Sequence, residues 1–177
     1  MAFLARDEGK LYYHVLKPSR TQAAKGGRTP TLLMLRGLGR SSRYWLGFDK
    51  IMSRHFQVIT LDPRGIGRST QPMHWTDTIE DLADDCIAVL DHIEIDKVHI
   101  FGLSLGGMVA SAIAAKEPER VESLIIAASS SSDYRAFRVS ATLLPKLLLA
   151  LRQGRFQDEL LVHCVPDLVR RSWGPEI

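Results

Sequence analysis

The sequence predicts an α/β protein with a mostly parallel β-sheet and helices on both faces. Three observations support this prediction: continuous apolar strand segments, helical segments between them, and one serine flanked by glycines where a strand turns into a helix. Strands that alternate with helices form parallel sheets with right-handed crossovers. With 177 residues, of which 45% are hydrophobic, the chain can bury one sizeable core.

The N-terminal third predicts a hairpin followed by a buried strand. Residues 2–17 have the pattern of a β-hairpin, with the turn at residues 7–9 and the second strand at residues 11–16. Residues 18–30 contain two prolines and two glycines and predict a loop. Residues 31–36 are a nearly continuous apolar run, which is typical of a strand covered on both faces.

The middle of the chain continues the alternation. Residues 44–52 predict a helical segment, and residues 58–62 predict the next strand. A further helix is expected to begin at Asp77, with Glu80 as its capping partner. Its apolar residues recur at helical spacing and predict one buried face. These residues are Ile79, Leu82, Ala83, Cys86, Ile87, Leu90 and Ile93.

The most informative stretch joins a strand at residues 97–101 to an alanine-rich helix at residues 108–115. Between them, residues 102–106 read Gly-Leu-Ser-Leu-Gly. A strand that turns directly into a helix strains the corner residue, and the close approach of the chain leaves room only for glycine on either side. The hydroxyl of Ser104 then lies at a helix N-terminus, where N–H groups favour negative charge. The pattern indicates a nucleophile; the alternative is a serine that only caps the helix.

The sequence pattern changes in the C-terminal third of the chain. Residues 121–128 predict one more strand, which ends in a run of serines. From residue 134 onward, short apolar helices are expected around Pro145. We therefore expect a core at residues 1–133, and residues 134–177 as either buried core helices or a partial helical cap over a pocket.

Three motifs, in the same order, closely resemble those of the α/β-hydrolase superfamily, in its serine esterase and lipase-like branch. They are Arg-Gly-Leu-Gly at residues 36–39, Asp-Pro-Arg-Gly-Ile-Gly-Arg-Ser at residues 62–69, and the serine motif at residues 102–106. The resemblance covers residues 1 to about 133. We expect the second motif to be a structural turn beside the site.

The resemblance implies roles for three residues. Ser104 is the expected nucleophile, and the backbone N–H groups of Leu38 and Leu105 are the expected oxyanion donors. The implied reaction is hydrolysis of carboxylic esters or related acyl substrates through an acyl-enzyme, with no cofactor and no metal. Relatives that open epoxides or displace halide carry aspartate at the serine position, so this chain is unlike those branches.

The sequence departs from the family in two places. Arg36 stands where the family usually has a histidine that orders the oxyanion loop, and an arginine could hydrogen-bond there instead. Family members also continue into two more strands that carry the catalytic acid and a histidine. None of the histidines here matches that late position: His14, His55, His74, His92, His99 and His163. Asp133 and His163 are the remaining candidates, and surface roles explain both as well.

This second departure leads to further expectations. We expect a C-terminally incomplete fold, weak or no catalysis by the chain alone, and self-association through an exposed sheet edge. A non-catalytic chain is therefore one alternative to an active hydrolase. A dinucleotide-binding oxidoreductase is a weaker one, because Gly37, Gly39 and Asp62 match only half of that fingerprint.

Composition limits the partners. A net charge of +3 without an aromatic-interleaved basic stripe gives no support for nucleic-acid binding. No apolar run is long enough for a membrane span, and the N-terminus lacks the apolar core of a signal peptide. Two distant cysteines, Cys86 and Cys164, make no disulfide framework, so a cytoplasmic protein is expected. The partner that the resemblance implies is a small ester-like substrate.

Overall fold

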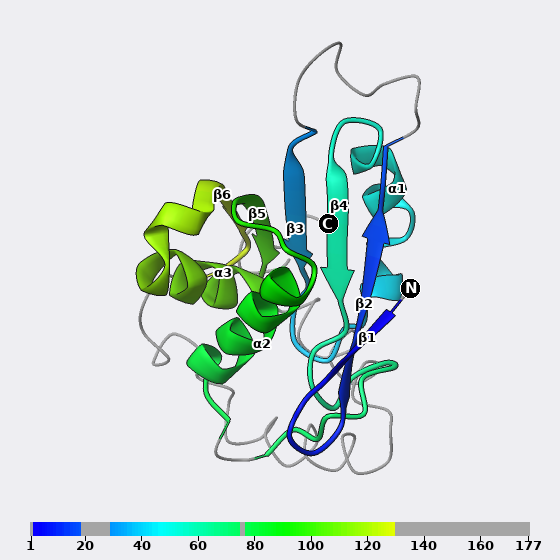
Figure 1. Cartoon of the computed structure of the whole chain (residues 1–177), viewed down its shortest axis with the longest axis vertical. Helices are drawn as coiled ribbons and strands as arrows, with labels where there is room; N and C mark the ends of the chain where they lie inside the picture. The colour runs from blue at the N-terminus through cyan, green and yellow to red at the C-terminus, as the bar shows by residue number, and fades with distance from the viewer. Residues whose placement is uncertain (1, 19–28, 75–76, 130–177) are drawn as a thin grey trace, which may run out of the picture. The chain divides into compact units, whose positions relative to one another are not determined.

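The computed structural model describes residues 2–18, 29–74 and 77–129, which form a six-stranded sheet with helices on both faces (Figure 1). The strands lie in the order β1-β2-β4-β3-β5-β6. The hairpin β1–β2 joins β4 antiparallel, and β4, β3, β5 and β6 are parallel. The expected fold class is confirmed, with the N-terminal hairpin at one edge. The cap expected at residues 134–177 lies outside the described residues.

Apart from the segment at residues 44–52, the expected elements agree with the observed ones to within about three residues. The strands are β1 (Ala2–Ala5), β2 (Lys10–Leu16), β3 (Thr31–Leu35), β4 (Gln57–Leu61), β5 (Val98–Leu103) and β6 (Val121–Ala127). The helices are the 3-10 helices η1 (Ser42–Trp45) and η2 (Pro118–Arg120), and α1 (Phe48–Met52), α2 (Ile79–His92) and α3 (Leu105–Lys116). No helix in the described ranges is long and apolar enough to cross a membrane.

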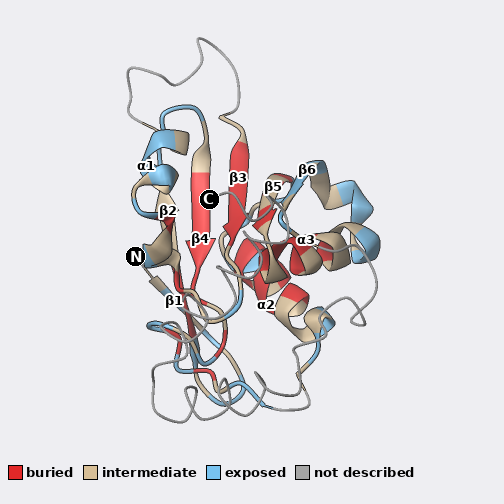
Figure 2. Ribbon diagram, turned by 180° about the vertical axis from the view of Figure 1, so that it is seen from behind, coloured by how far each residue is buried: buried red, intermediate tan, exposed pale blue. Residues whose placement is uncertain are grey.

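The central strands are buried because each of their faces packs against a different layer. Leu33 and Leu35 of β3 belong to the core shared with α2 and α3. Leu32 and Met34 point the other way and pack with Trp45 of η1. All five residues of β3 are buried, which Figure 2 shows in red together with most of β4. This double burial explains the continuous apolar run in the sequence.

The helical segment expected at residues 44–52 is instead two short helices, η1 and α1. Leu46 has φ 51° and Gly47 has φ 92°, so both lie in the left-handed region and interrupt the helix. Trp45 is buried, whereas Leu46 is 87% exposed. The spacing of the apolar residues correctly predicts where this helical segment lies. In the sequence, only Gly47 indicates that the helix is interrupted.

The expected cap of α2 is wrong: the helix begins after Thr78, not at Asp77, and Glu80 is not the capping partner. The Thr78 hydroxyl accepts from the Asp81 N–H at 3.2 Å, and the Asp81 carboxylate accepts from the Thr78 N–H at 2.7 Å. These hydrogen bonds from Thr78 lower the pKa of Asp81. Asp77 is unavailable because its carboxylate binds Arg64.

A buried ion-pair network ties the loop after β4 to α2. Nε and a terminal nitrogen of Arg64 donate to the two carboxylate oxygens of Asp85, at 2.8 and 2.9 Å. Its other terminal nitrogen donates to Asp77 at 2.9 Å. Asp85 is 1% exposed and also lies 3.2 Å from Nε of Arg6. Pairing with Asp85 raises the pKa of Arg64. No pattern in the sequence marks Asp85, which lies between apolar positions of α2.

The sheet ends at β6 in the described part of the chain, where β6 pairs only with β5. Ile125 and Ile126 of this strand are 56% and 41% exposed. An unpaired strand edge with exposed apolar side chains favours association. Self-association through β6 stays a prediction.

Removal of Asp85 tests the ion-pair network. We predict that Asp85→Ala lowers the free energy of unfolding by about 3–5 kcal/mol, because it leaves the Arg64 guanidinium buried without its main partner. Urea unfolding measures the change. The matched control is Asp84→Ala, whose pair with Lys116 is exposed to solvent and should contribute little to stability. A loss for Asp85→Ala as small as that of the control would contradict this role.

Candidate active site

Ser104 occupies the sharp corner between β5 and α3. Its backbone has φ 55° and ψ −120°, a strained conformation for a non-glycine residue, as the sequence predicted. The Ser104 N–H donates to the Ala127 carbonyl at 2.9 Å, which holds the corner against β6. Although Ser104 is the N-cap residue of α3, its side chain makes no capping hydrogen bond. The helix therefore does not use the hydroxyl, contrary to the simple capping interpretation.

Two glycines make this corner possible. A Cβ on Gly102 would lie 2.4 Å from the Gly106 carbonyl oxygen. A Cβ on Gly106 would lie 2.3 Å from the Leu35 carbonyl oxygen. Both contacts are with backbone atoms, which cannot turn aside as a flexible side chain can. The first turn of α3 thus packs directly against the ends of β3 and β5, and the prediction that only glycine fits is confirmed.

The loop after β3 passes beside Ser104. A Cβ on Gly37 would lie 3.2 Å from the Ser104 Cβ and 3.6 Å from its Oγ. The loop then turns, with the Arg40 N–H donating to the Gly37 carbonyl at 3.2 Å and Gly39 at φ 67°. Leu38, at the tip of this turn, is 45% exposed. This arrangement puts the first expected oxyanion donor in the segment next to the serine.

Both expected donors are unused within the described residues: neither the Leu38 nor the Leu105 N–H donates a hydrogen bond there. Leu105 is the first residue of α3, where N–H groups have no partner inside the helix. The first turn of α3 carries no acidic residue, so its partial positive charge is not neutralised locally. Negative charge near Ser104 Oγ would be stabilised by this helix end.

The motif at residues 62–69 stabilises the segment that follows the Gly37–Arg40 turn. Asp62 is 1% exposed, and its carboxylate accepts from the Ser42 N–H at 2.6 Å and the Arg68 N–H at 2.9 Å. A Cβ on Gly67 would lie 2.3 Å from that carboxylate. Asp62 therefore fixes the start of η1, just after the Gly37–Arg40 turn. This agrees with a structural turn, and it leaves Asp62 poorly placed to bind a ribose.

Arg36 does not take over the hydrogen bonding expected of the family's histidine. Its Nε is buried and has no hydrogen-bond partner. The guanidinium carbon instead lies 4.7 Å from the centre of the Trp45 ring. Burial, and secondarily the charge of Arg40, lower the pKa of Arg36. The loop is held by Asp62 and by its own turn rather than by this side chain.

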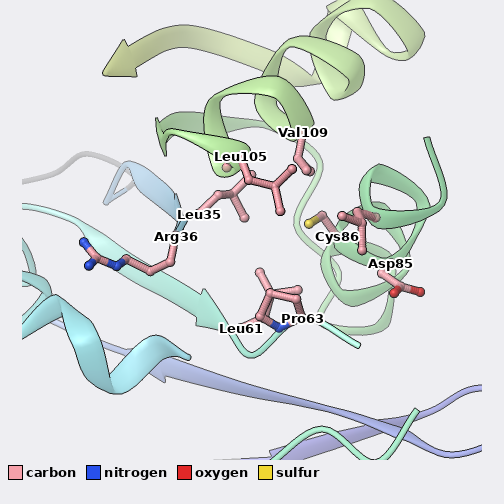
Figure 3. A pocket seen from close by; sticks show the side chains of 10 residues that line it. Leu35, Arg36, Leu61, Pro63, Asp85, Cys86, Leu105 and Val109 are labelled. Carbon is pink, nitrogen blue, oxygen red and sulfur yellow. The ribbon is translucent and has the colours of Figure 1, made fainter. Parts of the chain in front are cut away.

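Two hollows lie near the corner, and Ser104 lines neither of them. The first, of about 30 Å³, lies between the sheet and helices α2 and α3 (Figure 3). It has room for only a water or two, so it is a packing gap. Burial raises the pKa of the Cys86 thiol at its wall. The second is an open groove of about 580 Å³ between the loops after β3 and β4. Its lining includes Ser41, Leu46 and Gly67.

No histidine in the described ranges hydrogen-bonds to Ser104. His74 is paired with Glu8 at 3.1 Å. His99 lies at the opposite end of β5, where it contacts Ser123 at 2.8 Å and Glu122 at 2.9 Å. The candidates Asp133 and His163 lie outside the described residues.

A methyl group at Gly106 tests the close packing of α3. We predict that Gly106→Ala lowers the free energy of unfolding by about 1–3 kcal/mol, because the added Cβ overlaps the Leu35 carbonyl. Thermal or urea unfolding measures the loss. Ser111→Ala, in the same helix, should change stability by no more than about 0.5 kcal/mol. If Gly106→Ala is as stable as Ser111→Ala, the packing described here is wrong.

Comparison with known protein families gives one match that covers most of the chain. The family model described as alpha/beta hydrolase fold matches residues 30–163. Among curated proteins, RutD of Agrobacterium fabrum, which is named as a carbamate hydrolase, is 37% identical over 104 residues. That match covers 56% of this chain and 40% of RutD. The chain thus spans less than half the length of this relative.

Solved structures show the same fold. A hydrolase from Pseudomonas aeruginosa PA01 matches with a TM-score of 0.68 and 28% identity, covering 85% of this chain and 52% of that one. The enol-lactonase from Burkholderia xenovorans LB400 matches with a TM-score of 0.71 and 23% identity. That match covers 96% of this chain and 62% of the lactonase, and at this identity it bears on the fold alone.

Proposed function

Because the chain belongs to the α/β-hydrolase-fold family, we propose that it acts as a serine hydrolase on carboxylic esters or related acyl substrates. Ser104 is the proposed nucleophile. One observation carries the proposal: Ser104 lies at a strained strand–helix corner, and its hydroxyl is not used to cap the helix. Such strain is characteristic of functional sites.

The proposed reaction begins when Ser104 Oγ attacks the acyl carbon and gives up its proton to a base. The carbonyl oxygen becomes an oxyanion, which the N–H groups of Leu38 and Leu105 are proposed to bind. Loss of one such donor typically costs about 3–4 kcal/mol of transition-state stabilisation. The oxyanion collapses and the base passes the proton to the leaving group, which departs as an alcohol or amine. Water then gives a proton to the base and attacks the acyl carbon, and the bond to Ser104 Oγ breaks, which releases the acid and restores the serine hydroxyl.

We propose that the base comes from outside the described residues, since no histidine within them contacts Ser104. Serine without a base is a weak nucleophile at neutral pH. His163, outside the described residues, is one candidate for the base, and Asp133 is one for the acid. Without any base the chain would be a non-catalytic member of the family, which is the second candidate. The oxidoreductase alternative has no support, because the carboxylate of Asp62 is already occupied.

The relatives help to define the substrate class. RutD is named as a carbamate hydrolase, and one structural neighbour is an enol-lactonase. Carbamates, lactones and esters all present an acyl carbon bonded to a heteroatom that can leave. A single serine corner with two oxyanion donors suits each of them. Hence we keep the proposal at the level of acyl substrates.

A fluorophosphonate probe tests the nucleophile. We predict that the probe labels the wild-type chain on Ser104 and that Ser104→Ala removes the labelling. The control is Ser123→Ala, because Ser123, unlike Ser104, hydrogen-bonds to a histidine of the described part, His99. Mass spectrometry of the labelled peptide identifies the site. Labelling of Ser104→Ala at the wild-type rate would remove Ser104 from the mechanism.

Ester turnover separates the two candidates. A catalytic chain hydrolyses p-nitrophenyl acetate repeatedly and loses this turnover in Ser104→Ala. A non-catalytic chain shows no turnover above that of Ser104→Ala.

A further inference from the structure

Arg36 lies next to the proposed nucleophile and lacks the partners that the ion-paired arginines have. Arg64 is paired with Asp85 and Asp77, and Arg120 with Asp91. Arg36, in contrast, makes no hydrogen bond or ion pair within the described residues, and its Nε is buried. A buried polar group without a partner is costly, and a charged one more so. Such a group calls for an explanation.

The stacking of Arg36 on Trp45 offsets only part of this cost. The guanidinium carbon lies 4.7 Å from the ring centre, in the range of a cation–π contact. Such contacts contribute about 0.5–2 kcal/mol and satisfy none of the N–H donors. Trp45 itself packs against the sheet, where its ring centre lies 5.5 Å from that of Phe101 in β5. The stack therefore holds the guanidinium in one place while leaving its hydrogen-bonding groups unused.

The position of Arg36 relates it directly to the serine. It precedes Gly37, whose added Cβ would lie 3.6 Å from Ser104 Oγ. Leu35 pairs with Gly102 in the parallel register of β3 and β5. Arg36 is therefore one residue beyond the last paired position on β3, and Ser104 is two residues beyond it on β5. In Figure 3 its side chain points away from Asp85 and Cys86, which line the cavity beneath α3. It extends toward the η1 face of the sheet, where Trp45 lies.

We propose that Arg36 binds a carboxylate on the acyl part of the substrate, so that the substrates are acyl compounds carrying a second, negatively charged carboxylate. This rests on the proposed function, because it places the acyl group on Ser104. A guanidinium presents a planar fork of donors that matches a carboxylate. A bound carboxylate would pair with the terminal nitrogens of Arg36, for which no described residue provides an acceptor, and its negative charge would offset the repulsion from Arg40.

Labelling of Ser104 with matched probes tests this assignment. The probes are two p-nitrophenyl alkylphosphonates of equal chain length, one ending in a carboxylate and the other in its methyl ester. The readout is the ratio of the two labelling rates. We expect the wild-type chain to favour the carboxylate probe by at least tenfold, Arg36→Gln to lose this preference, and Arg36→Lys to regain part of it.

Arg54→Gln is the charge-matched control, because Arg54 is exposed after α1 and should leave the ratio unchanged. An unchanged ratio in Arg36→Gln overturns the proposal. So does a fall in both rates by the same factor, since that outcome indicates a purely structural role. A fall in the ratio that Arg54→Gln shares would indicate only the general charge of the protein, and would also overturn it.

A second measurement does not depend on the reactivity of Ser104. Isothermal titration compares monomethyl succinate, which carries a carboxylate, with the neutral dimethyl succinate. We expect at least tenfold tighter binding of the anion by the wild-type chain, and equal, weak binding of both by Arg36→Gln. If neither phosphonate labels Ser104 but the anion still binds through Arg36, the proposed function fails and the carboxylate site stands. Equal binding of the two succinates by the wild-type chain overturns the site.

Discussion

The whole site depends on one close contact, the packing of the first turn of α3 against the ends of β3 and β5. At Gly106 this contact leaves no room for a single methyl group, since the Leu35 carbonyl oxygen occupies the place of a Cβ. The same contact forces Ser104 into its strained conformation and brings the loop at Gly37 beside it. Backbone packing of this kind is rigid because interiors are packed as densely as crystals.

Two sets of buried polar contacts stabilise the loops next to this corner. The Asp62 carboxylate binds the backbone at Ser42 and Arg68, and so it ties the segment after the Gly37–Arg40 turn to the end of β4. Arg64 in turn ties that end of β4 to Asp85 on α2. Both carboxylates are 1% exposed, so these bonds are shielded from water and from salt. The corner, the loop and α2 are therefore joined by short, buried contacts.

Much of this arrangement could be predicted from the sequence, because it depends on backbone geometry that only certain residues permit. The glycines around Ser104 and the apolar run of β3 gave the corner, the parallel sheet and its two covered faces. Asp85 could not be found in the same way, since a buried charge has no periodic signature and depends on a partner distant in sequence. The cap of α2 was misplaced because Asp77 and Thr78 are both good capping residues. Which of the two caps the helix depends on Arg64, because Arg64 binds the Asp77 carboxylate.

The role of Arg36 was open at the sequence level for a related reason. An arginine side chain is long, and its sequence position does not say whether it turns toward the loop or toward Trp45. The structure places it on Trp45, with Nε unused. The proposed site therefore combines a backbone feature that sequence patterns specify with a side-chain position that they do not.

The central claim is that the acyl group is bound covalently to Ser104, and that the substrate oxyanion is bound by the N–H groups of Leu38, in the loop after β3, and of Leu105, in α3. A crystal structure of the chain with a phosphonate bound covalently to Ser104 tests this most directly. The account predicts that the phosphonyl oxygen lies within about 3 Å of the Leu38 and Leu105 backbone nitrogens. A phosphonyl oxygen that points into solvent, away from both N–H groups, would contradict it.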